Sequence, residues 1–180
     1  MNCPRGHGPL LLRDKDGERM ERTASLSDCG TYRWTLTRGW ASGSTVCWIM
    51  LNPSTADAEQ DDPTVRSIIK RSQAWGYGSL VVVNSYPFRS SHPQACAEWL
   101  KSASKDVLAH NLFVMKTEMD KADLIVAAWG NAGWLPAEDT SRYDLYCIGT
   151  NANGTPKHPL ARGKHRVPED TEPQLWRAAL

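Results

Sequence analysis

Thr45-Val46-Cys47-Trp48-Ile49-Met50-Leu51 is apolar at almost every position and leads directly into Asn52-Pro53. A strand with one face in water alternates apolar and polar residues, whereas a continuous apolar run of this length is typical of a strand buried on both faces. Three more runs of this kind occupy residues 80–84, 123–128 and 143–148. The sequence therefore predicts four strands that other layers of the protein must cover.

Helical patterns lie between these runs. Asp62-Pro63 opens the first helix, since Asp is a good N-cap and Pro is favoured at the first helical position. Apolar residues near helical spacing continue to Trp75, and Gly76 ends this helix. A second helical stretch extends from Pro93 to Lys121. Buried strands that alternate with amphipathic helices predict an α/β fold, a three-layer αβα sandwich with a mostly parallel central sheet.

Length and composition limit the classes of protein that fit. The chain has 180 residues, 41% of them apolar, and a formal net charge of +1, which suits a single domain. We expect an irregular N-terminal arm or hairpin over residues 1–30, an α/β core over 31–168, and a C-terminal tail or short helix over 169–180. The longest unbroken apolar run, Leu80–Val83, is too short for a membrane span of ~20 residues. The N-terminus lacks the apolar core of a signal peptide. We expect a cytoplasmic monomer without a cofactor.

The cysteine and carboxylate patterns predict no metal site. Five cysteines are an odd number, and no two have the close spacing of a zinc site, so we expect them to be reduced and buried. Cys3 and His7 suggest half of a metal site that no second pair completes. An acidic cluster between Asp57 and Asp62 has the oxygen ligands that a hard cation needs. The preference for carboxylates at the start of a helix explains most of this cluster without a metal.

Each buried strand leads into a loop with polar side chains. Asn52-Pro53 follows the first strand, Asn84 ends the second, Trp129-Gly130 follows the third, and a loop with His158-Pro159 follows the fourth. Ligands of open parallel sheets bind outside the carboxyl ends of the strands, so the four loops together predict a site at one sheet edge. Each asparagine taken alone is better explained as a turn residue. The glycine-rich signatures of nucleotide-binding loops are absent from the sequence.

A basic stretch follows the last predicted strand. Residues 145–168 contain no Asp or Glu, and three further basic residues lie between positions 66 and 71. A local basic stripe on a nearly neutral protein suits contact with phosphate groups. A solvated loop explains the same pattern equally well, and both interpretations stay open at this stage. The Lys and Arg residues of the stretch are Lys157, Arg162, Lys164 and Arg166.

Longer motifs resemble a known family. The runs Met50–Asp57, Asp61–Thr64 and Trp75–Gly78 resemble a bacterial and phage family known as domain of unknown function number 1643. This resemblance extends over most of the chain, and the runs that carry it are fairly specific.

A remoter resemblance connects residues 45–160 with the uracil-DNA glycosylase superfamily. Leu51-Asn52-Pro53 resembles the first motif of its mismatch-specific branch, and Val82-Val83-Asn84 resembles the strand whose terminal Asn reads the uracil edge. Trp129-Gly130 resembles the Trp-Gly strand end of that superfamily, and Lys157-His158-Pro159 resembles its final His-Pro motif. The order and approximate spacing of the four motifs agree.

The remoter resemblance implies a uracil-DNA-glycosylase-like fold and a DNA-base-directed enzyme. Such an enzyme hydrolyses the N-glycosidic bond of an unusual or modified base, or otherwise acts on a flipped base. A neutral His158 would donate a hydrogen bond to the departing base, and Asn52 would position the attacking water. Residues implied to bind the base are Pro53, Ser54, Thr55, Asp57, Asn84, Tyr86 and Phe88. Residues implied to contact nucleic acid are Arg89, Lys157, Arg162, Lys164 and Arg166.

Two other function classes stay open beside this hypothesis. The same scaffold suits a non-catalytic module that binds nucleic acid or a nucleotide. It also suits an enzyme that acts on an unrelated small substrate, with the basic loop holding one anionic group. Fold alone does not decide among these classes. We therefore expect DNA or a nucleotide as the partner, and no membrane.

Overall fold

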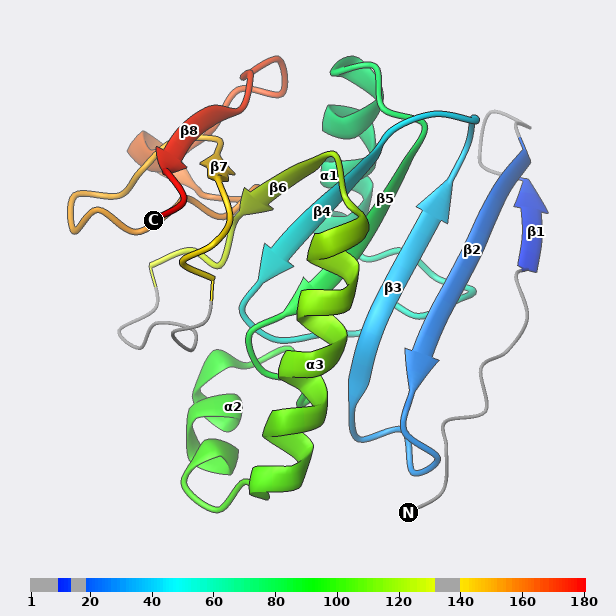
Figure 1. The fold of residues 1–180 in the computed structure, drawn as a ribbon, viewed down its shortest axis with the longest axis vertical. Coiled ribbons are helices and arrows are strands. Elements are labelled where there is room, and N and C mark those ends of the chain that lie inside the picture. The colour runs from blue at the N-terminus through cyan, green and yellow to red at the C-terminus, as the bar shows by residue number, and fades with distance from the viewer. Residues whose placement is uncertain (1–9, 14–18, 132–139) are drawn as a thin grey trace.

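One sheet of eight strands organises the chain (Figure 1). The computed structural model describes residues 10–13, 19–131 and 140–180. The strands are β1 Leu10–Arg13, β2 Arg19–Leu26, β3 Arg33–Gly39, β4 Thr45–Met50, β5 Ser79–Asn84, β6 Leu124–Ala127, β7 Leu145–Cys147 and β8 Gln174–Arg177. Their order across the sheet is β1-β2-β3-β5-β4-β6-β7-β8.

The four strands that the apolar runs predict form the parallel centre of this sheet. β4 pairs in parallel with β5 on one side and with β6 on the other, and β6 pairs in parallel with β7. Ile49 lies opposite both Val83 and Ala127, and all three residues are fully buried. Burial on both faces accounts for their continuous apolar sequence. The predicted α/β class is confirmed.

The outer strands correct the expectation of a mostly parallel sheet. β1, β2 and β3 pair antiparallel with one another, β3 joins β5 antiparallel, and β8 joins β7 antiparallel, so the sheet is mixed. β1 and β2 pair antiparallel as in a hairpin, the second of the two forms expected for residues 1–30, and this pair belongs to the sheet. The C-terminal segment contains a strand where we expect a tail or short helix. Without these strands, β5 and β7 would expose rows of unpaired backbone groups.

In the described parts of the chain, three α-helices accompany the sheet: α1 Pro63–Ala74, α2 Pro93–Leu100 and α3 Lys105–Lys121. α1 begins as predicted, because the Asp62 carboxylate accepts a hydrogen bond of 2.9 Å from the Val65 N–H and Pro63 takes the first helical position. The predicted helical stretch up to Lys121 is interrupted over residues 101–104 and forms two helices. Two serines lie in this interruption, and serine side chains compete with helical backbone bonds.

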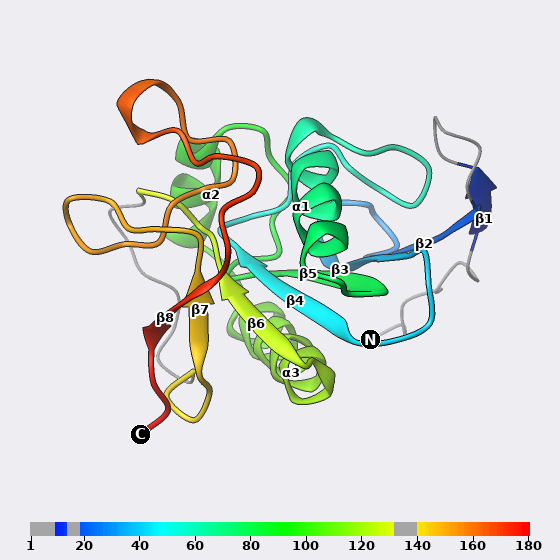
Figure 2. The ribbon, with the colours of Figure 1, turned by 90° about the horizontal axis from the view of Figure 1, so that it is seen from above.

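The two long helices cover opposite faces of the sheet (Figure 2). α1 buries Ile68 in a cluster that includes Trp48 of β4. α3 buries Met115 and Met119 in a second cluster that includes Ile49 of the same strand. Alternate residues of β4 therefore face different helices, as the two-residue period of a strand requires.

Most tryptophans and cysteines of the described chain contribute to packing. Trp48 is fully buried and stacks on Trp75 of the turn after α1, with ring centroids 5.4 Å apart. Cys47, Cys96 and Cys147 are buried, and burial raises the pKa of each thiol. Cys29 differs from the expectation of burial, because it lies exposed in the turn between β2 and β3.

The described residues contain neither a membrane-spanning helix nor a group of metal ligands. Among them, no helix has the length and apolar content that a membrane crossing requires. No group of three or more His, Cys, Asp or Glu side chains in this part of the chain is arranged to hold a metal ion. Cys3 and His7 lie outside the described residues.

Candidate functional site at the carboxyl edge of the sheet

The parallel strands bring the predicted site residues to one edge. Asn84, the last residue of β5, lies opposite Met50 of β4, so Asn52 and Asn84 leave the sheet at the same edge. Gly130 follows β6 at this edge, and β6 is separated from β5 only by β4. Two strand spacings amount to about 10 Å, close to the dimension of a nucleotide-sized ligand.

Asn84 is the polar centre of this edge. Its side chain is 1% exposed, and its Oδ1 accepts a hydrogen bond of 3.3 Å from the Arg33 guanidinium. Arginine can only donate, so this bond fixes Oδ1 toward Arg33 and identifies Nδ2 as the remaining donor of the amide. Nδ2 has no hydrogen-bond partner within the described residues. A buried donor without a partner costs about 1–3 kcal/mol, which marks the position as functional or strained.

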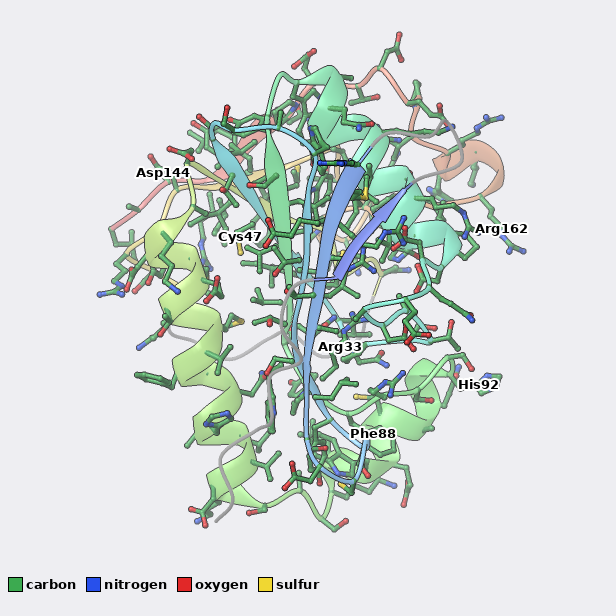
Figure 3. All side chains as sticks on the ribbon, turned by 90° about the vertical axis from the view of Figure 1, so that its right-hand side faces the viewer. Arg33, Cys47, Phe88, His92, Asp144 and Arg162 are labelled. Carbon is green, nitrogen blue, oxygen red and sulfur yellow. The ribbon has the colours of Figure 1, made fainter. Side chains whose placement is uncertain are left out.

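Arg33 reaches Asn84 from the antiparallel part of the sheet (Figure 3). In the pairing with β2, Thr35 lies opposite Ser25 but Arg33 lies opposite Leu26, so β3 holds one extra residue there. Such a bulge changes which face the following side chains take. Arg33 is 3% exposed and also donates to the Ala56 carbonyl at 2.8 Å, which ties the loop after β4 to β3.

The positively charged guanidinium of Arg33 is buried and has little contact with solvent. Burial lowers the pKa of its guanidinium to about 10, and the carboxylate of Asp62 opposes this change. The guanidinium stays charged near neutral pH. Its Nε is buried and has no partner in the described part of the chain. The site therefore contains a fixed positive charge beside the Asn84 amide.

His158 lies at the same edge, against the end of β6. A Cβ added to Gly130 would lie 3.2 Å from the His158 Cβ, and Gly130 also has a φ of +83°, so glycine suits this position on both counts. The Leu160 N–H donates a hydrogen bond of 3.0 Å to His158 Nδ1. An accepting Nδ1 places the proton of the neutral imidazole on Nε2. His158 is thus prepared as a neutral donor.

We expect the imidazole of His158 to titrate with a midpoint below 6.5. Burial lowers its pKa, and the nearby Asp62 carboxylate opposes this only in part. The folded protein then binds fewer protons than the unfolded chain, so its stability is greatest above the unfolded pKa and falls as the pH drops through the folded pKa. The measurement is an NMR titration of the imidazole signals, assigned by their loss in His158→Gln. A midpoint at or above 6.5 would contradict this protonation state.

Asn52 has a structural role in the described geometry. Its Nδ2 donates to the carbonyls of Ser90 at 2.8 Å, Pro53 at 3.0 Å and Phe88 at 3.4 Å. These bonds fasten the loop after β5 to the loop after β4, as the turn interpretation predicts. The amide donors of Asn52 are therefore already engaged, and only its Oδ1 is available to hold a water.

The residues implied to bind the base are placed in different ways. Phe88 stacks on Trp99 with ring centroids 5.2 Å apart and 7° between the planes, so one ring face is covered. The Asp57 carboxylate accepts hydrogen bonds from the Glu59 and Gln60 N–H groups and so stabilises its own loop. Of the remaining residues, Pro53 is buried, Ser54 and Tyr86 are half-buried, and Thr55 is exposed.

The acidic cluster serves the loop rather than a cation. Asp61 pairs with Arg22 at 2.9 Å and with Arg38 at 2.7 Å, and both arginines lie on the sheet below the loop. Arg38 is fully buried and also donates to the Asp57 carbonyl. With Asp62 capping α1, each of the three aspartates has a protein partner that explains its presence. Two strands thus hold the loop in place from beneath.

The basic residues are distributed over two places. Arg162, Lys164 and Arg166 are exposed on the segment around a short 3₁₀ helix, Gly163–His165, that follows His158. Lys157 is half-buried next to His158. Arg89 comes from the loop after β5, where its charge acts on Arg33, and donates to the Gly30 carbonyl at 3.2 Å. The first group forms a surface that borders the candidate site.

Three residues have roles at this edge that the sequence does not predict. Arg33 sits in a strand-like pattern, but its partner Asn84 is 51 positions away. Asn111 is buried on α3 and donates to the carbonyls of Asn84 and Ser85. Asp62 is identified only as a helix cap, although its charge also acts on Arg33 and His158. The alternating, strand-like pattern from Tyr32 to Arg38 is the only signal in the sequence that bears on Arg33.

Comparison with known proteins identifies the family of the chain. The chain belongs to the family described as protein of unknown function (DUF1643), whose model matches residues 33–160. The match begins at Arg33 and ends two positions after His158, so it contains the whole candidate site. No curated protein and no solved structure matches the chain.

Proposed function

We propose that this protein is a DNA-base-directed enzyme of the uracil-DNA-glycosylase type, which hydrolyses the N-glycosidic bond of an unusual or modified base. The observation that carries the proposal is the buried Asn84 amide, whose Nδ2 donor has no partner among the described residues. A base offers ring nitrogens and carbonyl oxygens as acceptors for such a donor. The uracil-DNA-glycosylase-like sandwich fold is part of the same proposal.

His158 supplies the second donor of the proposed site. Its Nδ1 already accepts from Leu160, so its Nε2–H is the group that meets a ligand. When the glycosidic bond breaks, the bonding electron pair goes to the base, and negative charge develops on the base oxygens. A preorganised neutral donor stabilises this charge in the transition state. The lowered pKa of His158 keeps the imidazole neutral near pH 7.

Water then completes the reaction at the sugar. The water oxygen forms the new bond to the sugar carbon that the base has left, and the water loses one proton. An amide accepts a proton poorly, and the donors of Asn52 are engaged with backbone carbonyls. We assign proton acceptance to Asp62, the carboxylate whose charge acts on both Arg33 and His158. Asn52 then orients the water through Oδ1.

The bordering basic segment supports DNA as the substrate. Lys157, Arg162, Lys164 and Arg166 offer charge to phosphates next to the proposed base site. Binding through such contacts weakens as salt rises, because bound counterions are released from the DNA. Arg89 is less suited to this role, since its guanidinium is engaged with the Gly30 carbonyl.

The proposal is tested with a panel of oligonucleotides, single-stranded and duplex, each with one uracil or one modified base. After incubation with the protein, mass spectrometry identifies any free base, and alkali reveals abasic sites. We expect one member of the panel to yield free base and abasic site in equal amounts. Intact oligonucleotides throughout the panel, despite salt-sensitive binding, would favour a non-catalytic binding module instead.

A further inference from the structure

A cavity of about 370 Å³ lies between α1 and the segment that follows His158. Its polar lining consists of Ser67 and Arg71 from α1 and Arg162, Arg166 and Glu169 from the segment. The charged lining thus consists of three arginines and one glutamate, so positive charge is in excess. The volume falls at the lower end of ligand pockets, which occupy about 300–1,000 Å³. In Figure 3, Arg162 projects from the orange segment on the side of the molecule where α1 lies.

The guanidinium of Arg71 is a buried hydrogen-bond donor whose position in the cavity lining is fixed by other bonds. Its side chain is 1% exposed, and its two terminal nitrogens donate to the carbonyls of Val167 at 3.0 Å, Pro168 at 2.7 Å and Glu169 at 3.2 Å. These bonds fix the plane of the guanidinium and hold the segment against α1. The Nε of Arg71 is buried and has no partner in the described part of the chain.

The other two arginines of the lining, Arg162 and Arg166, have side chains without a protein partner among the described residues. Arg162 and Arg166 are exposed, and neither side chain forms an ion pair or a hydrogen bond with another described residue. Burial lowers the pKa of Arg71, while Glu169 and Asp170 oppose that change, so a bound anion would compensate the poor solvation of the guanidinium. Guanidinium groups suit phosphate, because their planar N–H groups match its oxygens.

We propose that this cavity binds a phosphate group, carried by a phosphomonoester or by the phosphodiester backbone of a nucleic acid. Arg71 would donate from Nε, Arg162 and Arg166 would donate from the open side, and the Ser67 hydroxyl would complete the set. Pro159 and Leu160 form part of the lining, so the phosphate would lie next to His158. Phosphate binding in the cavity does not depend on base hydrolysis at Asn84.

The test is an NMR titration of the intact protein with inorganic phosphate, followed at the Arg71 Nε–H signal. We expect a saturable shift that chloride at the same ionic strength does not produce. Arg166→Gln should weaken phosphate binding about tenfold, the lower end for losing a hydrogen bond to a charged group. Lys70→Gln, on the exposed part of α1, removes the same charge without lining the cavity and should change binding less than about twofold.

Two further measurements complete the test. Arg71→Lys keeps the charge but removes the Nε donor, and it should weaken binding if the variant melts as the wild type does. A 5′-mononucleotide that binds more tightly than phosphate identifies a phosphomonoester, and a tighter single-stranded oligonucleotide identifies the backbone; either result supports the proposal. An absent or non-saturable shift would overturn it, and so would equal weakening by Arg166→Gln and Lys70→Gln.

Discussion

Replacing His158 by alanine is expected to lower the single-turnover rate of base release about 100-fold or more, the usual scale for losing one donor to a developing negative charge. The affinity for the substrate DNA should stay within about twofold, because the interaction is strongest in the transition state. The rate is measured on the oligonucleotide that yields free base, with the protein in excess, and the affinity by titration of the same oligonucleotide.

A matched control separates chemistry from stability in this prediction. His165→Ala removes an exposed imidazole from the short 3₁₀ helix that follows His158. This variant should leave the rate of base release and the affinity for the substrate DNA unchanged. Loss of the bond between the Leu160 N–H and His158 Nδ1 costs about 1 kcal/mol of stability, so the variant remains folded. An undiminished rate in a folded His158→Ala protein would remove His158 from the reaction.

The second large effect concerns the ion pairs beneath the loop after β4. We expect Asp61→Ala to lower the free energy of unfolding by about 3–5 kcal/mol, because Arg22 and the fully buried Arg38 lose their carboxylate partner. That loss is a large fraction of the about 5–15 kcal/mol that stabilises an ordinary domain. Urea unfolding measures it as a lower midpoint with an unchanged slope.

An exposed ion pair on α2 provides the comparison. Glu98→Ala removes the partner of Lys101, and both side chains of that pair are 72% exposed. Exposed pairs contribute about 0–1 kcal/mol, so this variant should unfold almost as the wild type does. Equal losses in the two variants would show that burial of the Asp61 network is not what stabilises the loop.

The sequence predicts the centre of the sheet because burial on both faces leaves a local signal. The run from Thr45 to Leu51 needs no distant information to be recognised as a buried strand. β2 has no such signal, since Arg22 interrupts its apolar face, and only the ion pair with Asp61 makes that position tolerable. β8 is four residues long and is defined by its pairing with β7.

The candidate site likewise contains residues that the sequence predicts and residues that depend on distant contacts. Asn84 and His158 follow buried strands, and the rule that parallel strands present their carboxyl ends at one edge brings them together. Arg33 orients Asn84 through a contact 51 positions away and through a bulge, neither of which a sequence pattern records. The turn interpretation explains the bonds that Asn52 Nδ2 makes, so only Oδ1 of this residue serves the proposed positioning of water.

We propose that Asn84 and His158 face one site that takes a base. An NMR titration with free uracil and other free bases tests this arrangement, with the Asn84 side-chain amide and the His158 imidazole followed together. We predict that one base shifts both groups along a single saturation curve. Arg33→Met should remove the response, because it releases the orientation of the amide. A base that shifts His158 while the Asn84 amide stays unchanged, or no response to any base, would contradict the claim.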